Sequence, residues 1–524
     1  MRYDDTFLSI PHAIRIASRS FGDDTALIDG SRRWSFRELE QQMAEAVKAT
    51  VALGVEPGDR VGLCAPNSAE WIFAALGIQG AGGVLVPLNT RFKAAEISYI
   101  LQKSGAKSLI ASPFLGNDYI AELRKTDPGL PALRKTASIP SWPEFLLGGR
   151  GVSTSLVHDL IDRLTPDDVS DVMFTSGTTG HPKGVVLTHG QSLRAYGWMA
   201  EEYTFARSDS FLIIPPFFHC FGYKAGWLAS LMHGVTVIPM PVFDAGRALD
   251  IIAREKVSIL LGPPTIFQDL IRHPDRPSYD LSSLRVSMTG GTTIPESLIR
   301  AMKSELSFDI VMSAYGLTES TALVTTTRIG DSEETVARTT GRVIPDVEIR
   351  IADDESSDAG GKGAPPGQDG EVLVRGYNVT RGYWEDPEAT AAAIDPEGWL
   401  RTGDIGRLDE DRNLSIVDRK KDMYIVGGFN AYPAEIEKLL LGHELIEQAA
   451  VIGIPDDRLG EVGCAFVVVK PGHHVTEKDI VEWARENMAN FKVPRHVRFS
   501  GQLPRNASQK VLKDELRARF VSGD

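Results

Sequence analysis

The chain has 524 residues, more than one hydrophobic core usually serves, which predicts two or three domains. Apolar residues make up 42% of the sequence and charged residues 24%, as in ordinary globular proteins. The formal net charge of −14 argues against nucleic acid or an anionic membrane surface as a partner held by overall charge. An anionic substrate would therefore need a local cluster of hydrogen-bond donors.

The cysteines and the first residues of the chain indicate its cellular compartment. Cys64, Cys220 and Cys464 lie far apart without metal-site spacing, which is typical of buried thiols in a reducing compartment. Residues 1–5 carry two acids and lead into no apolar segment of a signal peptide. No run reaches the roughly 18 apolar residues of a membrane span. We expect a cytoplasmic protein without an integral membrane segment; peripheral membrane attachment and homo-oligomer formation stay open.

Helical and strand patterns alternate in the first half of the chain. Leu39, Met43, Val47 and Val51 recur at helical spacing on one face of residues 37–53. Further helices are expected at 68–80 and 94–103, and strands at 60–65, 84–87 and 108–111. The alternation resumes over residues 171–341 and favours parallel sheets covered by helices.

The pattern of expected helices and strands changes after residue 341. Strands are expected at 347–352, 371–375, 407–409 and 414–417, with a solvated loop at 353–369. From residue 421 the pattern predicts a compact unit with helices at 433–441 and 477–488, strands at 448–454, 463–469 and 496–500, and a tail. We place a domain boundary at 418–421, giving domains 1–420 and 421–524.

A loop rich in glycine and hydroxyl groups lies between the strands expected at 172–174 and 185–187. Its sequence is Thr175-Ser176-Gly177-Thr178-Thr179-Gly180-His181-Pro182-Lys183-Gly184. Backbone N–H groups, hydroxyls and a lysine ammonium suit a phosphate group. The Walker A pattern fails, because Pro182 stands where its second glycine belongs and Gly184 where it needs Ser or Thr. A plain glycine-rich turn is the remaining alternative, but it needs neither the hydroxyls nor the lysine.

This loop resembles the signature of the adenylate-forming superfamily, which includes acyl-CoA synthetases, nonribosomal-peptide adenylation domains and beetle luciferases. The resemblance extends over residues 27–517, and the sequence is most similar to those of bacterial fatty acyl-CoA synthetases. It implies an α/β fold in which the large N-terminal domain has helix-covered parallel sheets and a small β-barrel-like subdomain. A small α+β C-terminal domain would follow, joined by a hinge at Lys421.

Further motifs follow in the order of the family. They are Thr289-Gly290-Gly291-Thr292-Thr293, Tyr315-Gly316-Leu317-Thr318-Glu319, Trp399-Leu400-Arg401-Thr402-Gly403-Asp404, the segments 215–222, 417–422 and 427–437, and Leu503-Pro504-Arg505-Asn506-Ala507-Ser508-Gln509-Lys510-Val511-Leu512. By resemblance, ATP, Mg²⁺ and coenzyme A are bound.

The resemblance implies a role for each matching residue. Residues assigned to the nucleotide and coenzyme are Thr175, Ser176, Gly177, Thr178, Thr179, Gly180, Lys183, Gly290, Gly291, Thr292, Tyr315, Gly316, Thr318, Asp404, Arg419 and Gly428. Glu319 would hold Mg²⁺, because a hard cation prefers carboxylate oxygen. Catalysis is assigned to Lys510, His219, Thr318 and Glu319. Gln509 departs from the family's usual glycine and Asn506 from its usual threonine, so Lys513 is kept as a weaker candidate than Lys510.

The acyl pocket implied by the resemblance is largely apolar. Its expected lining is His219, Phe221, Tyr223, Lys224, Gly290, Gly316, Leu317 and Leu323. Pro215 and Pro216 stand where amino-acid activators of the family carry an aspartate, which disfavours amino acids. Lys224 is unusual in such a pocket. We expect it to face solvent, or else to meet a second polar group of the substrate.

Three functions fit these residues. The first is an ATP-dependent acyl-CoA synthetase for an apolar carboxylic acid, either a fatty acid or a bulky, steroid-ring-derived propionate. The second is an acyl-AMP ligase that loads a carrier protein. The third is a non-catalytic ligand-binding member of the fold, which the intact motif residues disfavour.

Overall fold

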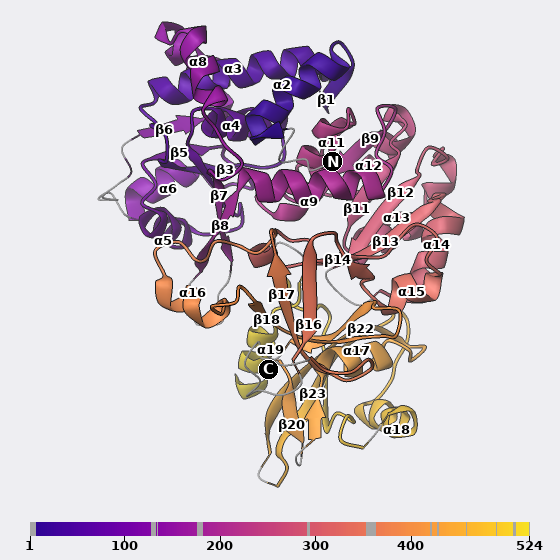
Figure 1. Cartoon of the computed structure of the whole chain (residues 1–524). Helices are drawn as coiled ribbons and strands as arrows, with labels where there is room; N and C mark the ends of the chain where they lie inside the picture. The colour runs from indigo at the N-terminus through magenta and orange to yellow at the C-terminus, as the bar shows by residue number, and fades with distance from the viewer. Residues whose placement is uncertain are drawn as a thin grey trace.

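Four β-sheets and their connecting helices make up the protein (Figure 1). The computed structural model describes residues 7–126, 133, 135–175, 182–290, 294–352, 363–419, 422–426, 429–456, 458–488, 490–506 and 510–522, with the backbone alone at 126, 419, 429 and 430. The two larger sheets are mostly parallel, as the alternating sequence pattern predicts.

A six-stranded sheet has the order β6-β5-β3-β4-β7-β8 and is parallel except at its β7–β8 edge. Its strands are β3 (Arg60–Cys64), β4 (Val84–Pro87), β5 (Ser108–Ala111), β6 (Lys135–Ser138), β7 (Val169–Thr175) and β8 (Lys183–Thr188). Strands β3, β4 and β5 match the expected segments closely. The antiparallel β7–β8 hairpin carries the glycine-rich loop.

A nine-stranded sheet has the order β15-β14-β13-β12-β11-β9-β10-β1-β2. Its strands are β1 (Thr25–Asp29), β2 (Arg32–Ser35), β9 (Ser210–Ile213), β10 (Thr236–Pro239), β11 (Ile259–Gly262), β12 (Val286–Gly290), β13 (Ile310–Tyr315), β14 (Thr325–Thr326) and β15 (Arg342–Val343). The strands from β1 to β13 in this order are parallel, and β2, β14 and β15 are antiparallel.

Three of the helices between these strands, α3, α4 and α5, match the segments expected at 37–53, 68–80 and 94–103 to within about a residue. The α-helices of this part are α2 (Ile10–Phe21), α3 (Phe36–Ala52), α4 (Ala69–Gly80), α5 (Ala94–Ser104), α6 (Tyr119–Thr126), α7 (Trp142–Gly148), α8 (Thr154–Asp162), α9 (His189–Glu202), α10 (Cys220–Gly222), α11 (Ala229–Met232), α12 (Ala245–Glu255), α13 (Pro264–Arg272), α14 (Glu296–Leu306), α15 (Glu333–Arg338) and α16 (Pro387–Ala393). Helix α3 has a capping box from Ser35 and Glu38, and it buries Leu39, Met43 and Val47.

Asn67 joins the two larger sheets at the edge where their parallel strands end. It lies three residues beyond β3, and its amide nitrogen donates to the carbonyl oxygens of Pro215 at 3.0 Å and Met240 at 3.2 Å, just beyond β9 and β10. Its amide oxygen accepts from the backbone N–H of Phe217 at 2.8 Å. Because ligands bind beyond the carboxyl ends of parallel strands, this contact fixes where a site can form.

The third sheet is a curled antiparallel sheet, β16-β17-β18-β19, and corresponds to the expected barrel-like subdomain. Its strands are β16 (Val347–Ile351), β17 (Gly370–Gly376), β18 (Leu400–Leu408) and β19 (Leu414–Arg419). Residues 353–362 of the expected solvated loop lie outside the described residues.

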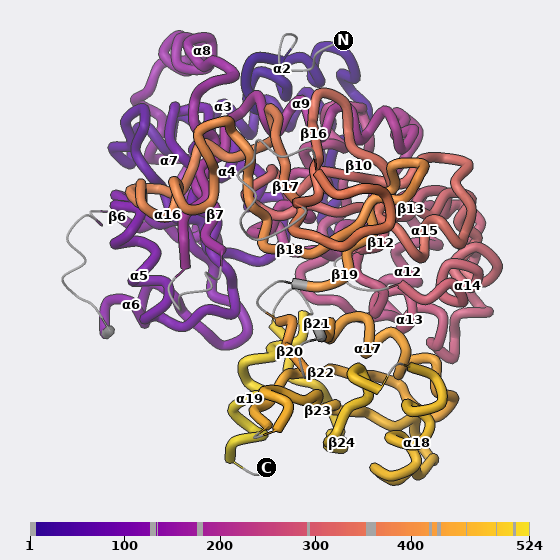
Figure 2. Tube along the Cα trace, turned by 60° about the horizontal axis from the view of Figure 1, so that its bottom comes forward, coloured from indigo at the N-terminus to yellow at the C-terminus, as the bar shows by residue number. Residues whose placement is uncertain are grey.

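The described residues from 422 onward form a separate five-stranded sheet with three helices, drawn in orange to yellow at the bottom of Figure 2. These elements are β20 (Tyr424–Val426), β21 (Phe429–Ala431), α17 (Pro433–Leu440), β22 (Ile446–Asp456), β23 (Gly460–Val469), α18 (Glu477–Asn487), β24 (His496–Phe499) and α19 (Lys513–Ser522). The expected terminal tail is wrong, because α19 occupies it. The β20–β21 hairpin was not expected either. The boundary at 418–421 and its hinge stay predictions, and Lys421 lies outside the described residues.

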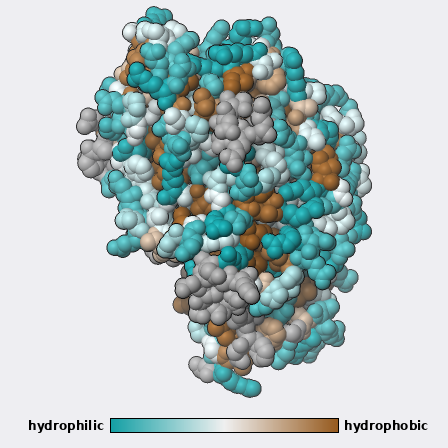
Figure 3. All heavy atoms as spheres, viewed as in Figure 1, coloured by the Kyte–Doolittle hydropathy of each residue, from teal (hydrophilic) through white to brown (hydrophobic). Residues whose placement is uncertain are grey.

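The surface and the cysteines complete this picture. Hydrophilic side chains cover most of the face in Figure 3, and hydrophobic ones form small patches. Across the described residues, none of the helices combines the length and apolarity that crossing a bilayer requires. All three cysteines are buried free thiols, as expected.

A buried histidine joins α2 to α9. The backbone N–H of Ile10 donates to Nδ1 of His189 at 3.2 Å, and the His189 side chain is buried. Burial lowers the pKa of this imidazole to about 3; the nearby Lys224 lowers it further, and Asp168 opposes the shift. The folded chain thus stays unprotonated at His189 at pH values where the unfolded chain binds a proton.

Acid should therefore destabilise the fold through His189. Above pH 6.5 the imidazole is neutral in both states, and below it the unfolded state gains a proton first. We expect His189→Gln, which keeps an acceptor for Ile10, to make the unfolding free energy fall less steeply on acidification. The slope should decrease by at most about 1.4 kcal/mol per pH unit. Urea unfolding between pH 7 and pH 5 measures this. The same substitution at the exposed His158 should keep the wild-type slope, and equal slopes for both variants would contradict the argument.

Candidate active site

The β7–β8 hairpin places the two ends of the glycine-rich loop opposite each other. Thr175 at the end of β7 pairs with Lys183 at the start of β8. The intervening residues Ser176, Gly177, Thr178, Thr179 and Gly180 lie outside the described residues. The Lys183 ammonium lies 5.0 Å from the ring centroid of Tyr383, so an aromatic face holds it.

Glu319 lies beside this hairpin, although it is 136 residues from Lys183 in sequence. It sits in a 3₁₀ turn, η5 (Thr318–Ser320), that follows β13. Its Oε1 atom accepts from the Tyr383 hydroxyl at 3.0 Å and from Thr175 Oγ1 at 3.5 Å. The structure thus brings together Thr175, Lys183, Thr318 and Glu319, which the sequence assigned to phosphate and metal.

A second cluster gathers the residues assigned to the nucleoside. The Tyr315 hydroxyl donates to Asp404 Oδ2 at 2.6 Å, and Asp404 is buried in β18. Arg419 pairs with Asp404 across the β18–β19 ladder. Gly290 pairs with Ala314, next to Tyr315. The tertiary structure therefore brings these four segments of the predicted nucleotide site to one region.

Gly316 requires the absence of a side chain. A Cβ atom at this position would lie 2.3 Å from the carbonyl carbon of Ala322, closer than any real contact. The chain doubles back here, and Leu317 and Leu323 lie on its two arms; Leu323 is buried and Leu317 is half-buried. Gly291 and Thr292 of the neighbouring loop lie outside the described residues.

His219 marks the start of the predicted acyl-binding segment. Its Nδ1 accepts from the backbone N–H of Phe221 at 3.2 Å and so caps the short helix α10. Burial lowers the pKa of the imidazole below its usual value, which keeps His219 neutral. Gly222 fits beside it because a Cβ atom there would lie 2.2 Å from the Pro215 carbonyl oxygen.

The next residues form a six-residue π-helix, η3 (Tyr223–Leu228), and all of them are buried. Tyr223 stacks on Trp227 with ring centroids 4.8 Å apart, and its hydroxyl bonds Gln79 at 2.7 Å. π-helical turns are rare and often occur at functional sites. Tyr223 and Trp227 pack into the hydrophobic core against Trp71, so of these three aromatic residues only Phe221 is partly exposed on the predicted acyl side.

Lys224 does not face solvent, so that expectation is wrong. Its side chain is fully buried, and its ammonium lies 3.1 Å from Asp171 Oδ1 and 2.9 Å from Ser192 Oγ. Asp171 is also fully buried on β7 and accepts from Ser170. A buried charge needs a paired, hydrogen-bonded partner, and β7 supplies one that sequence spacing cannot reveal. A contact between Lys224 and the substrate stays a prediction.

The loop that carries Lys510 is closed by Asn506. The Asn506 side-chain oxygen accepts from the Lys510 backbone N–H at 2.9 Å, and the Asn506 N–H donates to the Lys510 carbonyl at 2.8 Å. The unusual Asn506 therefore fixes this turn; Gln509 lies outside the described residues. Lys513, the weaker candidate, forms an ion pair with Glu437 at 2.9 Å. Burial opposes its charge, but Glu437 and Asp418 raise the pKa of Lys513.

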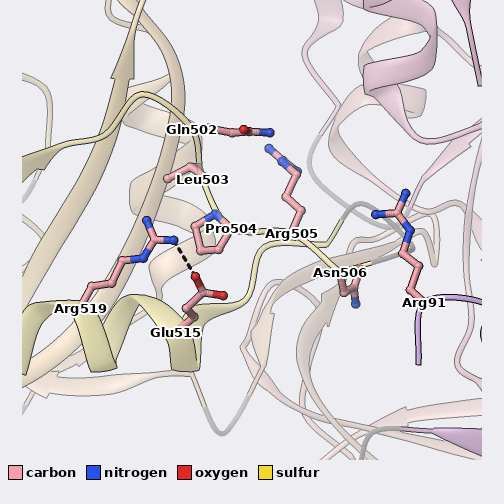
Figure 4. A pocket seen from close by; sticks show the side chains of 8 residues that line it. All are labelled: Arg91, Gln502, Leu503, Pro504, Arg505, Asn506, Glu515 and Arg519. Atoms are coloured by element: carbon pink, nitrogen blue, oxygen red, sulfur yellow. Dashed lines mark hydrogen bonds and ion pairs between the residues drawn. The ribbon is translucent and has the colours of Figure 1, made fainter. Parts of the chain in front are cut away.

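A cavity of about 440 Å³ separates this loop from the large domain (Figure 4). Arg91 lines it from beyond β4, and Gln502, Leu503, Pro504, Arg505, Asn506, Glu515 and Arg519 line it from the C-terminal unit. Strands β4 and β7 are parallel neighbours, so Arg91 lies at the edge from which the glycine-rich loop begins. The segment that leads into the Lys510 loop therefore lies across the cavity from the carboxyl edge of the six-stranded sheet.

Several site residues escaped the sequence analysis. Tyr383, Asn67 and Asp171 act through contacts with residues at least 53 positions away, and no local motif marks them. Gly428 and Lys421 lie outside the described residues. Among the residues that the structure describes, no group of three or more metal-binding side chains occurs.

The chain belongs to the AMP-binding enzyme family. Residues 14–384 match the model of the AMP-binding enzyme, and residues 435–510 match the model of its C-terminal domain. This family membership and the clustered motifs confirm the resemblance noted in the sequence.

Relatives define the class more closely. The chain is 48% identical over 97% of its length, and 98% of the other chain, to "3-[(3aS,4S,7aS)-7a-methyl-1,5-dioxo-octahydro-1H-inden-4-yl]propanoyl:CoA ligase" of Mycobacterium tuberculosis (strain ATCC 25618 / H37Rv). It is 46% identical, over 97% of its length and 98% of the other chain, to the protein of the same name from Rhodococcus jostii (strain RHA1). The anthranilate CoA ligase AuaEII, solved with anthranoyl-AMP, is 28% identical with a TM-score of 0.89 over 100% of both chains.

The protein is therefore an AMP-forming acid–thiol ligase, an acyl-CoA synthetase. It activates a small carboxylic acid as an acyl adenylate with ATP and transfers the acyl group to coenzyme A.

The Lys224–Asp171 pair gives a stability prediction. Lys224→Met leaves the Asp171 charge buried without its partner and should lower the unfolding free energy by about 3–5 kcal/mol. Adding Asp171→Leu should recover most of this loss. Lys256→Met, at the exposed Lys256–Asp280 pair, is the matched control and should cost less than about 1 kcal/mol. Chemical denaturation measures all three, and similar costs at both lysines would contradict the burial argument.

Proposed function

We propose that Lys183, Glu319 and Lys510 share the phosphate chemistry of adenylate formation, and that the acid is a bulky, ring-bearing propionate. The observation that carries the first part is the convergence of Lys183 and Glu319 at the base of one hairpin. A cation and a carboxylate placed beside a glycine-rich loop suit a nucleoside triphosphate better than any other ligand of this charge.

The first half-reaction is an in-line displacement. An oxygen of the substrate carboxylate attacks the α-phosphorus of ATP, the acyl–O–P bond forms, and the bond to the β-phosphate oxygen breaks. No general base is needed, since the carboxylate is already ionised at neutral pH. Positioning and charge neutralisation dominate such transfers. Lys183 and the loop of residues 175–180 hold the β- and γ-phosphates, and Lys510 neutralises charge at the α-phosphate and the attacking carboxylate.

Glu319 fits the role of a Mg²⁺ ligand. A lone carboxylate suits Mg²⁺, which takes its other ligands from phosphate oxygens and water. When bound, the ion neutralises phosphate charge. Thr318, in the same turn as Glu319, lies within reach of the phosphates in this proposal.

The nucleoside lies against the second cluster. Gly290, Gly291, Thr292, Tyr315 and Gly316 form the adenine face, where small residues let a flat base approach the backbone. Asp404 accepts hydrogen bonds from the ribose hydroxyls, and Arg419 contacts the nucleotide. The Tyr315–Asp404 hydrogen bond orients the carboxylate for this task.

The second half-reaction replaces AMP by a thiol. The sulfur of coenzyme A attacks the acyl carbon, the C–S bond forms, the C–O bond to phosphate breaks, and AMP leaves. His219 borders the acyl group, and Gly428 lies against the pantetheine arm. The segment that leads into the Lys510 loop lies across a cavity from the carboxyl edge of the six-stranded sheet, which supports our proposal that the C-terminal unit rotates about Lys421 between the two steps.

Lys510→Ala tests this division of labour. It should slow acyl-AMP formation by about 10²–10³-fold, the usual effect of losing one preorganised charge stabiliser, and spare thioester formation from preformed acyl-AMP. Pyrophosphate release and CoA consumption measure the two steps separately. Lys478→Ala, at an exposed lysine on α18, is the control. Equal losses in both steps would overturn the role of Lys510 and the proposed rotation.

The acid is proposed from the relatives of the chain. Two ligases named for a 7a-methyl-1,5-dioxo-octahydro-indenyl propanoyl group are 48% and 46% identical to this chain over nearly its whole length. Phe221 is partly exposed beside the buried apolar segment of residues 223–228, and an apolar ring system suits such a surface. We propose that this chain activates a propionate carried on such a ring system.

A panel of acids tests the substrate. The bicyclic dioxo-indenyl propanoate should give a kcat/KM at least about 10-fold above octanoate, palmitate and anthranilate, because losing matched apolar contacts costs about 10- to 200-fold. A fatty acid that outranks the bicyclic acid would overturn the ring-bearing class and leave adenylation intact. Pyrophosphate release without CoA consumption would indicate an acyl-AMP ligase for a carrier protein. The absence of both pyrophosphate release and CoA consumption would indicate a non-catalytic protein.

A further inference from the structure

Tyr383 lies between the two charged residues at the phosphate end of the site. Its hydroxyl donates to Glu319 Oε1 at 3.0 Å, and the Lys183 ammonium lies 5.0 Å from its ring centroid. One side chain therefore contacts both the carboxylate and the cation. We propose that Tyr383 is a positioning residue for adenylate formation, one that orients Glu319 and keeps Lys183 separate from it. The proposal rests on the proposed roles of Glu319 and Lys183.

The backbone around Tyr383 holds its ring in place. The Trp384 N–H donates to the Gly184 carbonyl at 2.7 Å, and the Val186 N–H donates to the Gly382 carbonyl at 3.0 Å. Residues 382–384 thereby extend the edge of the hairpin beside β8. The segment also reaches the turn of Glu319, because the Thr380 N–H donates to the Glu319 carbonyl at 2.7 Å.

The hydroxyl group fixes one oxygen of the carboxylate. A phenol has an ordinary pKa of about 10 and is neutral at pH 7, so the Tyr383 hydroxyl stays a donor. A neutral donor orients the carboxylate without cancelling its negative charge. Thr175 Oγ1 approaches the same oxygen at 3.5 Å, which leaves the carboxylate facing the phosphate end in a defined orientation.

The ring keeps the cation available. A lysine and a glutamate this close would otherwise form a direct ion pair, and such a pair would compete with phosphate for one partner and with Mg²⁺ for the other. The aromatic face attracts the ammonium less strongly than a carboxylate would. Lys183 can therefore leave the ring when the phosphates of ATP arrive. Tyr383 thus acts both as a hydrogen-bond donor and as a spacer.

Two substitutions separate these roles. Tyr383→Phe keeps the ring but removes the donor, and Tyr383→Leu removes both. Calorimetric titration with ATP, with and without Mg²⁺, reports binding without turnover. For Tyr383→Phe, the gain in ATP affinity on adding Mg²⁺ should be about 10-fold smaller than in the wild type. The ATP affinity without Mg²⁺ should stay within about twofold of the wild-type value. Tyr383→Leu should weaken ATP binding in both conditions, because Lys183 then pairs with Glu319.

The half-reactions and a control complete the test. Both variants should slow acyl-AMP formation and leave thioester formation from preformed acyl-AMP unchanged. Tyr279→Phe, at a half-buried tyrosine on the nine-stranded-sheet side, should behave as the wild type throughout. If Tyr383→Phe matched Tyr279→Phe in the titrations, the positioning role would be overturned. If Mg²⁺ failed to improve ATP binding even in the wild type, the proposed metal role of Glu319 would fail instead.

Discussion

The antiparallel pairing of β7 with β8 is the constraint on which the site depends. An otherwise parallel sheet ends in this hairpin, and its register sets Thr175 opposite Lys183 at the base of the glycine-rich loop. The outer edge of β8 then pairs with residues 380–384, which bring Tyr383 and, through Thr380, the turn of Glu319 to the same place. Three segments that lie far apart in the sequence thus meet through backbone hydrogen bonds, which fix positions more tightly than flexible side chains can.

A buried ion pair anchors the same hairpin. Asp171, on β7, pairs with Lys224 of the π-helix and lies in register with Leu85 of β4. A buried ion pair contributes little net stability, but breaking it is costly, so it selects one arrangement of the strand and the helix. In this chain it ties the strand that carries the phosphate loop to the segment that lines the predicted acyl pocket. One connected structure thereby joins the proposed phosphate and acyl sides of the site.

The C-terminal unit completes the site from the other side. Asn506 closes the turn that presents Lys510, and the cavity beside Arg91 shows that this turn faces the carboxyl edge of the six-stranded sheet. Asp418, at the end of the large domain, accepts from the backbone N–H of Ala434 at the start of α17 at 2.7 Å. The Arg272–Glu447 ion pair at 2.8 Å is a second contact between the C-terminal unit and the rest of the chain.

The sequence by itself determined the family, the reaction class, the parallel sheets and the boundaries of elements such as α3, α4 and β4. These follow from local signals: periodicity over α3, caps such as Ser35, and motifs whose residues are neighbours in sequence. Helix α19 escaped because it buries little beyond Leu516, so its residues show no apolar stripe. The π-helix escaped because it is buried on every side and so has no periodicity. Only the tertiary structure decided that Lys224 is paired with Asp171 and that Tyr383 joins Glu319 to Lys183. Both depend on strand pairings between distant segments, and one sequence carries no local signal of its partners across that distance.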